Sequence, residues 1–213
     1  NDISTYQTDK YWIAEGSKGL RSIQRKGSNS FEALNEPIIL DGPYSNSAFD
    51  IVCKNDKVYM IIGGKDLLNG KRFDKGGYIL TYDYDKWSFI DPKEAQKKLN
   101  LPRNPRDYTS IAVTTDDSND EIVYASSMGD GVIQYKNGTP VQSYNEKNAF
   151  KETAGGYGSG YCYIDGLAFD KNGNLWMTSS EVNHAVLVLD KAGAWHRLDI
   201  EQLRGVYTIN DIL

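Results

Sequence analysis

The chain of 213 residues is 39% hydrophobic and 25% charged, with a formal net charge of −5. An acidic chain lacks the basic surface that nucleic-acid binding requires, and none of its apolar runs approaches the roughly 20 residues that cross a bilayer. Fifteen tyrosines and 20 glycines against three methionines favour strands and turns over helices. The composition therefore predicts one β-rich domain.

In chain order, four segments share one pattern: an aromatic residue between apolar neighbours, small residues, and then a second apolar strand. The segments are 10–23, 57–65, 121–138 and 174–193, with Trp12, Tyr59, Tyr124 and Trp176 as their aromatic residues. Another short apolar strand and a turn rich in Asp, Asn and Gly precede the last three, as tight hairpins require. A repeat of roughly 40–50 residues with four strands is typical of propeller blades.

We therefore predict an all-β fold, a β-propeller segment of about four blades with four antiparallel strands each. The predicted blades are approximately 1–47, 48–108, 109–163 and 164–207, with 208–213 starting a further blade. Four blades either close on themselves or form a fragment of a larger propeller, and we favour the fragment. One blade cannot bury both faces of its sheet alone, so neighbouring blades are expected to stack.

Three long connections interrupt this pattern, at 63–77, 91–108 and 145–163. Propeller topology places all three on the same face, where long loops are either functional or simply tolerated. Residues 91–99 predict a short helix, because Asp91 can cap it and Pro92 suits its first position. Ala95 and Leu99 would share the inward face of that helix.

These connections supply the candidate ligand-binding residues. The loops 65–75 and 91–108 each carry a local net positive charge, and the third connection offers tyrosines among glycines. The candidates are Lys65, Lys71, Arg72, Arg103, Arg106, Tyr108, Tyr157 and Tyr161. Arg103 and Arg106 are the expected anchors, because a guanidinium group can bind a carboxylate or phosphate through two bonds. Solvated surface charge and packing between blades remain the alternative interpretations.

The sequence offers no linked nucleophile and base, and we expect no enzyme, no cofactor and no metal site. "DKNGN" at 170–174 indicates a tight turn rather than a calcium loop, because the later bidentate glutamate is missing. Cys53 and Cys162 are expected to be small buried residues.

"WIAEGSKGL" at 12–20 resembles the blade motif of two-component-regulator propellers of Bacteroidota. The ordered set "PRDYTSIAV", "SMGDGVIQYKNG", "SYNEKNAF", "IDGLAFDKNGNLWMTSS" and "LVLDKAGAW" resembles PorZ-like propellers of the type IX secretion system. The resemblance implies a non-catalytic recognition or scaffold module, periplasmic or at the cell surface. It implies a glycan, an anionic lipopolysaccharide or a protein as its partner.

"GNLWMTSS" at 173–180 also resembles the blades of streptogramin lyase-type and gluconolactonase-like propellers. This alternative implies a propeller enzyme of the lyase or lactonase type acting at the central channel. Its candidate residues are His184, Glu181 and Asp165. For His184, a plain surface histidine is the other interpretation.

Overall fold

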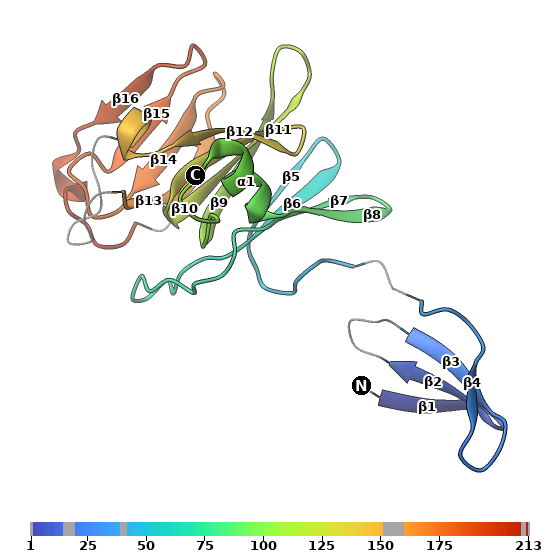
Figure 1. The fold of residues 1–213 in the computed structure, drawn as a ribbon. Coiled ribbons are helices and arrows are strands. Elements are labelled where there is room, and N and C mark those ends of the chain that lie inside the picture. Colours follow the sequence, from blue (N-terminus) through green and yellow to red (C-terminus); the bar gives the residue numbers. More distant parts are fainter. Residues whose placement is uncertain (1, 15–19, 39–41, 151–159, 210–211, 213) are drawn as a thin grey trace. The chain divides into compact units, whose positions relative to one another are not determined.

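The computed structural model describes residues 2–14, 20–38, 42–150, 160–209 and 212 (Figure 1). The chain forms two compact units, 1–42 and 43–213. Every pairing between the named strands is antiparallel. The predicted all-β antiparallel class is therefore confirmed.

The first unit is one meander of four strands in sequence order. The strands are β1 (Asp2–Gln7), β2 (Lys10–Ala14), β3 (Leu20–Arg25) and β4 (Phe31–Ala33). Among the described residues of this unit only Ser22 is buried, while Ile3 and Phe31 are exposed. This sheet therefore encloses little apolar surface of its own.

The second unit contains three further four-stranded meanders. The first comprises β5 (Ala48–Lys54), β6 (Lys57–Ile62), β7 (Ile79–Asp83) and β8 (Lys86–Ile90). The second comprises β9 (Tyr108–Thr115), β10 (Glu121–Gly129), β11 (Gly131–Lys136) and β12 (Thr139–Tyr144). The third comprises β13 (Cys162–Phe169), β14 (Leu175–Ser179), β15 (Val186–Leu189) and β16 (Trp195–Leu198). These strands lie within a few residues of the positions that the repeat predicts.

The sheet β9–β12 is covered on both faces, which follows from the alternation of side chains along its strands. Ile111, Val123 and Ile133 belong to a buried cluster with Tyr59 and Ile61 of the sheet β5–β8. The neighbouring residues Ala112, Ile122 and Val132 belong to a second cluster with Leu175, Met177 and Leu187 of the sheet β13–β16. Burial on both faces explains the continuous apolar character of these strands.

The predicted helix is present as α1 (Pro92–Leu99). Asp91 is its N-cap and accepts a hydrogen bond from the backbone N–H of Lys93 at 2.9 Å. Ala95 is fully buried and Leu99 packs on the cluster between β5–β8 and β9–β12, as expected. Two short helices, η2 (Glu146–Phe150) and η3 (Glu201–Leu203), were not anticipated.

The "DKNGN" segment is a tight turn between β13 and β14, as predicted. Asp170 Oδ1 accepts hydrogen bonds from the backbone N–H groups of Asn172 and Asn174, at 2.8 and 2.9 Å. Its Oδ2 accepts from Trp176 Nε1 at 3.0 Å. The indole bond, together with these backbone bonds, lowers the pKa of Asp170 to about 2. The carboxylate therefore serves the turn itself.

The expectation for the cysteines is correct for Cys162, which is buried, and wrong for Cys53, which is exposed. Val52 packs against the sheet β9–β12, so its neighbours Ile51 and Cys53 lie on the opposite face of β5. Ile51 on that face is also exposed. Burial at these positions is decided by which face of the sheet has a neighbour.

Candidate functional site

Two of the three long connections are hydrogen-bonded to each other in the second unit. The β6–β7 loop, residues 63–78, meets the segment 100–107 that follows α1. The backbone N–H of Asp107 donates to the carbonyl of Lys75 at 2.9 Å, and that of Gly77 donates to the carbonyl of Pro105 at 3.0 Å. At the base of the loop, Gly63 has φ +143°, and a Cβ there would lie 2.2 Å from the backbone nitrogen of Tyr108. Only glycine permits this approach.

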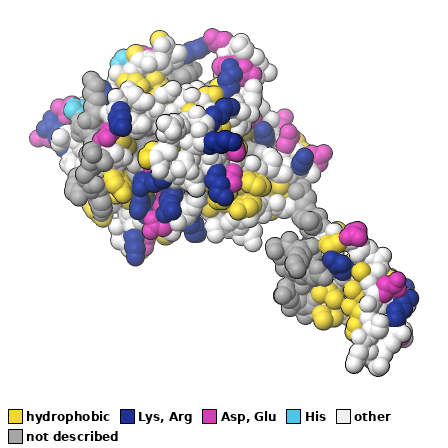
Figure 2. All heavy atoms as spheres, viewed as in Figure 1, with side chains coloured by type: hydrophobic (Ala, Val, Ile, Leu, Met, Phe, Trp, Pro, Cys, Tyr) yellow, Lys and Arg dark blue, Asp and Glu magenta, His cyan; other side chains and the backbone are white. Residues whose placement is uncertain are grey.

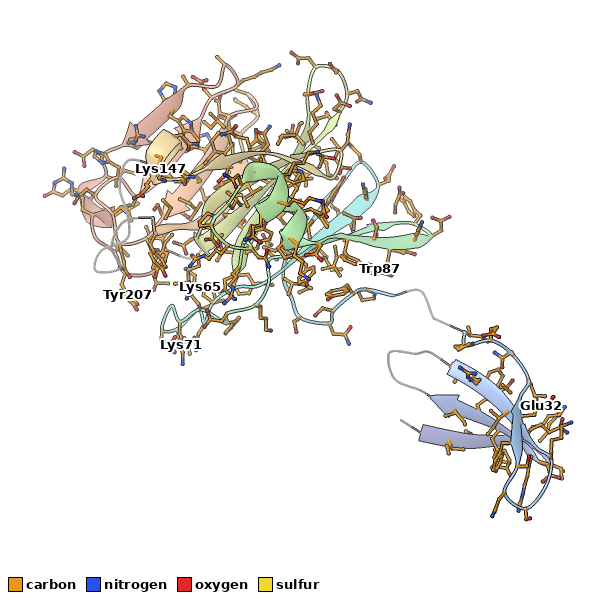
Figure 3. The ribbon with its side chains drawn as sticks, viewed as in Figure 1. Glu32, Lys65, Lys71, Trp87, Lys147 and Tyr207 are labelled. Atoms are coloured by element: carbon orange, nitrogen blue, oxygen red, sulfur yellow. The ribbon has the colours of Figure 1, made fainter. Side chains whose placement is uncertain are left out.

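Arginines from both segments lie over one tyrosine of the third connection. The guanidinium carbon of Arg103 lies 5.4 Å from the ring centre of Tyr161, and that of Arg72 lies 5.9 Å from it. Arg106 is exposed on the same segment as Arg103, and Lys71 is exposed next to Arg72. We call Lys71, Arg72, Arg103, Arg106 and Tyr161 the arginine face. Figure 3 shows Lys71 toward the tip of its loop.

Asp130 holds part of the arginine face in position. Its Oδ1 accepts from Arg103 Nε at 2.9 Å, and its Oδ2 accepts from the backbone N–H of Arg106 at 3.1 Å. Asp130 lies in the tight β10–β11 turn between Gly129 and Gly131, which both have positive φ. The sequence analysis missed this residue, although the Gly-Asp-Gly turn signal could have drawn attention to it.

The guanidinium groups of Arg72 and Arg103 act on the Tyr161 hydroxyl and on nearby carboxylates. A hydrogen bond from Arg103 lowers the pKa of the Tyr161 hydroxyl. Three carboxylates lie near the arginines: Asp74 pairs with Arg72 at 3.1 Å, Asp130 pairs with Arg103 at 2.8 Å, and the buried Asp107 interacts electrostatically with Arg72. Figure 2 shows Lys and Arg side chains gathered, with some Asp and Glu, over the lower part of the second unit in this view. The arrangement can attract and orient an anionic group.

Asp107 joins the two loops beneath the arginine face. Its Oδ1 accepts from the backbone N–H of Lys75 at 2.9 Å, and its carbonyl accepts from that of Met128 at 3.0 Å. Its Oδ2 is buried and has no hydrogen-bond partner among the described residues. Burial raises the pKa of this carboxyl group. Asp107 also adopts a left-handed backbone conformation, φ 48°, which is strained for a residue other than glycine. The hydrogen bonds of Asp107 to Lys75 and Met128 hold its backbone in this conformation.

Two of the candidate ligand-binding residues lie in the interior. Lys65 is 3% exposed and forms an ion pair with Asp165. Tyr108 is fully buried, and its hydroxyl lies 2.6 Å from that of Tyr135. Neither side chain reaches an external ligand in this conformation, so we remove both from the candidate set. Tyr157 lies outside the described residues.

The residues named for the enzyme alternative have structural partners. Asp165 is 1% exposed; its Oδ1 pairs with Lys65, and its Oδ2 accepts from Ser180 Oγ at 2.5 Å. Burial, followed by the charge of Asp165, raises the pKa of Glu181. His184 lies in the turn between β14 and β15 and is partly exposed. The described residues contain no group of three or more His, Cys, Asp or Glu side chains that could hold a metal ion.

The antiparallel meanders of the second unit, the last two of which are joined by pairing between β10 and β13, form a β-propeller-like fold, and the comparison with solved structures agrees. The chain is similar to PorZ, described as an essential bacterial surface component of the type-IX secretion system of Porphyromonas gingivalis. The TM-score is 0.68 at 21% identity, over 99% of this chain and 27% of that chain. The resemblance predicted from the sequence is thus confirmed at the level of the fold.

Two extracellular domains from B. thetaiotaomicron are also similar. One, from BT4673, described as a one-component system, has a TM-score of 0.45 at 18% identity, over 99% of this chain and 24% of that chain. The other, from BT3049, described as a hybrid two-component system, has a TM-score of 0.42 at 13% identity, over 93% of this chain and 22% of that chain.

The chain thus spans about a quarter of the length of these three structures. No family model and no curated protein matches its sequence. No helix among the described residues is long and apolar enough to cross a membrane.

Proposed function

We propose that this chain is a non-catalytic recognition or scaffold module whose arginine face binds an anionic glycan. The observation that carries the proposal is the convergence of Arg72 and Arg103, from two different loops, on the ring of Tyr161. Guanidinium groups bind carboxylates and phosphates through paired hydrogen bonds, and an aromatic face suits a sugar ring. An acidic surface of a protein partner is the second ligand that this chemistry fits.

The remaining assignments follow from the resemblance. PorZ is a bacterial surface component of a secretion system. We therefore propose a periplasmic or cell-surface location and a role as a sensor or secretion accessory. We also propose that 1–47, 48–108, 109–163 and 164–207 are blades of a larger propeller, with 208–213 starting the next. The residues 210–211 and 213 of that last segment lie outside the described part.

The test measures binding of an anionic lipopolysaccharide, with a neutral lipopolysaccharide as the reference ligand. The test variant is Arg72→Ala plus Arg106→Ala. Among the described residues, Arg72 forms an ion pair with the exposed Asp74, whereas Arg103 pairs with Asp130, which also holds the backbone of Arg106. Replacing Arg72 and Arg106 and keeping Arg103 should therefore leave the fold intact. We expect binding to weaken by more than about tenfold, because charge-assisted hydrogen bonds are lost.

The matched control is Lys93→Ala plus Lys97→Ala, which removes the same charge from the exposed side of α1. We expect the control to bind as the native chain does, and native binding to weaken with added salt. Unchanged binding by the arginine variant, or an equal loss in the lysine control, would overturn the proposal.

A further inference from the structure

A groove of about 670 Å³ lies between the sheets β9–β12 and β13–β16. It opens beside the β9–β10, β13–β14 and β15–β16 turns, which lie along the upper edge of the second unit in Figure 1, whereas the β6–β7 loop lies at the lower edge. Its volume falls within the range of small-molecule sites. We call it the inter-sheet groove. The arginine face does not contribute to its lining.

The floor of the inter-sheet groove is aromatic. Tyr124 and Tyr144 are stacked with ring centres 6.4 Å apart, and Phe169 meets Tyr124 edge to face at 5.9 Å. Tyr144 and Phe169 are only partly buried. Rigid aromatic faces provide apolar area at low entropic cost, which suits the C–H face of a sugar ring.

The rim of the groove is polar and balanced in charge. Three aspartates (Asp116, Asp117 and Asp190) and three lysines (Lys136, Lys171 and Lys191) line it. Lys136 is paired with Asp116 at 2.8 Å, and Lys191 with Asp117 at 3.3 Å. A charged ligand would compete with these pairs, whereas a neutral ligand would not. The charge balance therefore favours an uncharged, polyhydroxylated ligand.

Hydrogen-bonding groups remain available inside the groove. Gln134 Oε1 accepts from the Tyr144 hydroxyl at 2.9 Å, so the amide nitrogen of Gln134 is oriented and can donate. No described residue forms a hydrogen bond with the hydroxyl of Tyr124, although its ring is nearly buried. Burial raises the pKa of Tyr124 well above its usual value, so this hydroxyl stays protonated and can donate to a ligand.

We propose that the inter-sheet groove binds a neutral oligosaccharide, which packs a sugar ring on Tyr144 and Phe169 and bonds its hydroxyl groups to the rim. This site is separate from the arginine face in position and in ligand charge. β10 connects the two regions: Ile122 near its start lines the groove, while Asp130, just beyond its end, holds Arg103. A strand of this length separates them by roughly 25 Å.

The experiment measures binding of three neutral hexasaccharides, a β-glucan, a mannan and a chitin fragment, by saturation-transfer NMR and calorimetry with the full 213-residue chain. Thr114 is partly exposed and lines the groove from β9, so Thr114→Trp should block it. We expect this variant to lose binding. We expect Tyr124→Phe, which removes only one hydroxyl, to weaken binding about fivefold.

Tyr84→Phe is the matched control, because it removes an exposed hydroxyl that does not line the groove. We expect the control to bind as the native chain does. Arg72→Ala plus Arg106→Ala should also bind neutral sugars normally, which separates this test from that of the proposed function. Thermal melting checks that each variant is folded. Failure of all three sugars to bind the native chain, or native affinity in both groove variants, would overturn the proposal.

Discussion

The central sheet β9–β12 faces two inter-sheet spaces that differ at their edges. The space toward β5–β8 is closed: α1 packs into it through Ala95 and Leu99. Glu121 closes its edge by accepting hydrogen bonds from Tyr59 Oη at 2.5 Å and Lys57 Nζ at 2.8 Å. The space toward β13–β16 also has an apolar interior, but it opens into the inter-sheet groove.

The difference lies at the edge beside the β9–β10 turn, where the side chains of Glu121, Tyr59 and Lys57 meet across the first space while the second stays open. The strands bounding both spaces follow the same repeat. Each space receives a helix from a long connection: α1 from 91–108 packs into the first, and Ala149 and Phe150 of η2, from 145–163, are buried in the second. The turns beside the second space are short and satisfy their own polar groups, as Asp170 does, so none of them folds into the gap. Three predictions test this comparison.

We expect the largest loss of stability from breaking the buried ion pair between Lys65 and Asp165, which lies at the opposite edge of the sheets from the inter-sheet groove. Lys65 of the β6–β7 loop pairs with Asp165 of β13, which ties the outer two sheets of the second unit together. Lys65→Met would leave a buried carboxylate without its cation, and we expect the free energy of unfolding to fall by about 3 kcal/mol at neutral pH. Chemical denaturation measures this loss.

The loss should depend on pH. Burial already raises the pKa of Asp165, and removing Lys65 raises it further. When the pKa of a carboxyl group is higher in the folded state than in the unfolded state, the folded protein loses stability as the pH rises through the folded-state pKa. The variant should therefore recover stability at mildly acidic pH. Lys71→Met, on the exposed tip of the same loop, is the control, and an equal loss in both variants would contradict the assignment.

The second prediction compares isoleucines in the two spaces. Ile133 is completely buried in the closed space, while Ile122 lines the groove. Ile133→Ala should cost about 4 kcal/mol, because the cavity cannot collapse or fill with water. Ile122→Ala should cost about 2 kcal/mol, because its site is already next to open volume. Equal costs in urea unfolding would show that the two spaces are packed alike.

The third prediction compares tyrosine hydroxyl groups. Tyr108→Phe leaves the buried hydroxyl of Tyr135 without its partner, and we expect a cost of about 2 kcal/mol. Adding Tyr135→Phe should cost less than the sum of the single changes, because the unpaired group is then gone. Tyr124→Phe in the open space should change stability by less than about 0.5 kcal/mol. A similar cost for Tyr124→Phe would mean that its hydroxyl is bonded in the folded state.

Much of the architecture could be predicted from the sequence because its signals are local. Alternating apolar residues and Asp- or Gly-rich turns located the strands of the second unit, and Asp91 with Pro92 located α1. The sequence also predicted that Arg72, Arg103 and Tyr161 lie near one another, because all three lie on long connections that propeller topology places on one face. These signals depend on backbone geometry over only a few residues, so they can be recognised in the sequence without the tertiary structure.

Only the tertiary structure decided which side chains are covered and which are paired. Lys65 is buried where Asp165, 100 residues away in the sequence, neutralises its charge, and the buried Tyr108 hydroxyl is hydrogen-bonded to that of Tyr135. Cys53 is exposed because its face of β5 has no neighbouring sheet in the second unit, although its apolar run reads like a core strand. The sequence by itself determined the strands, turns and helix cap. Burial, charge pairing and the open groove depend on contacts between segments that are distant in the sequence. A local sequence pattern does not specify which distant segments come into contact.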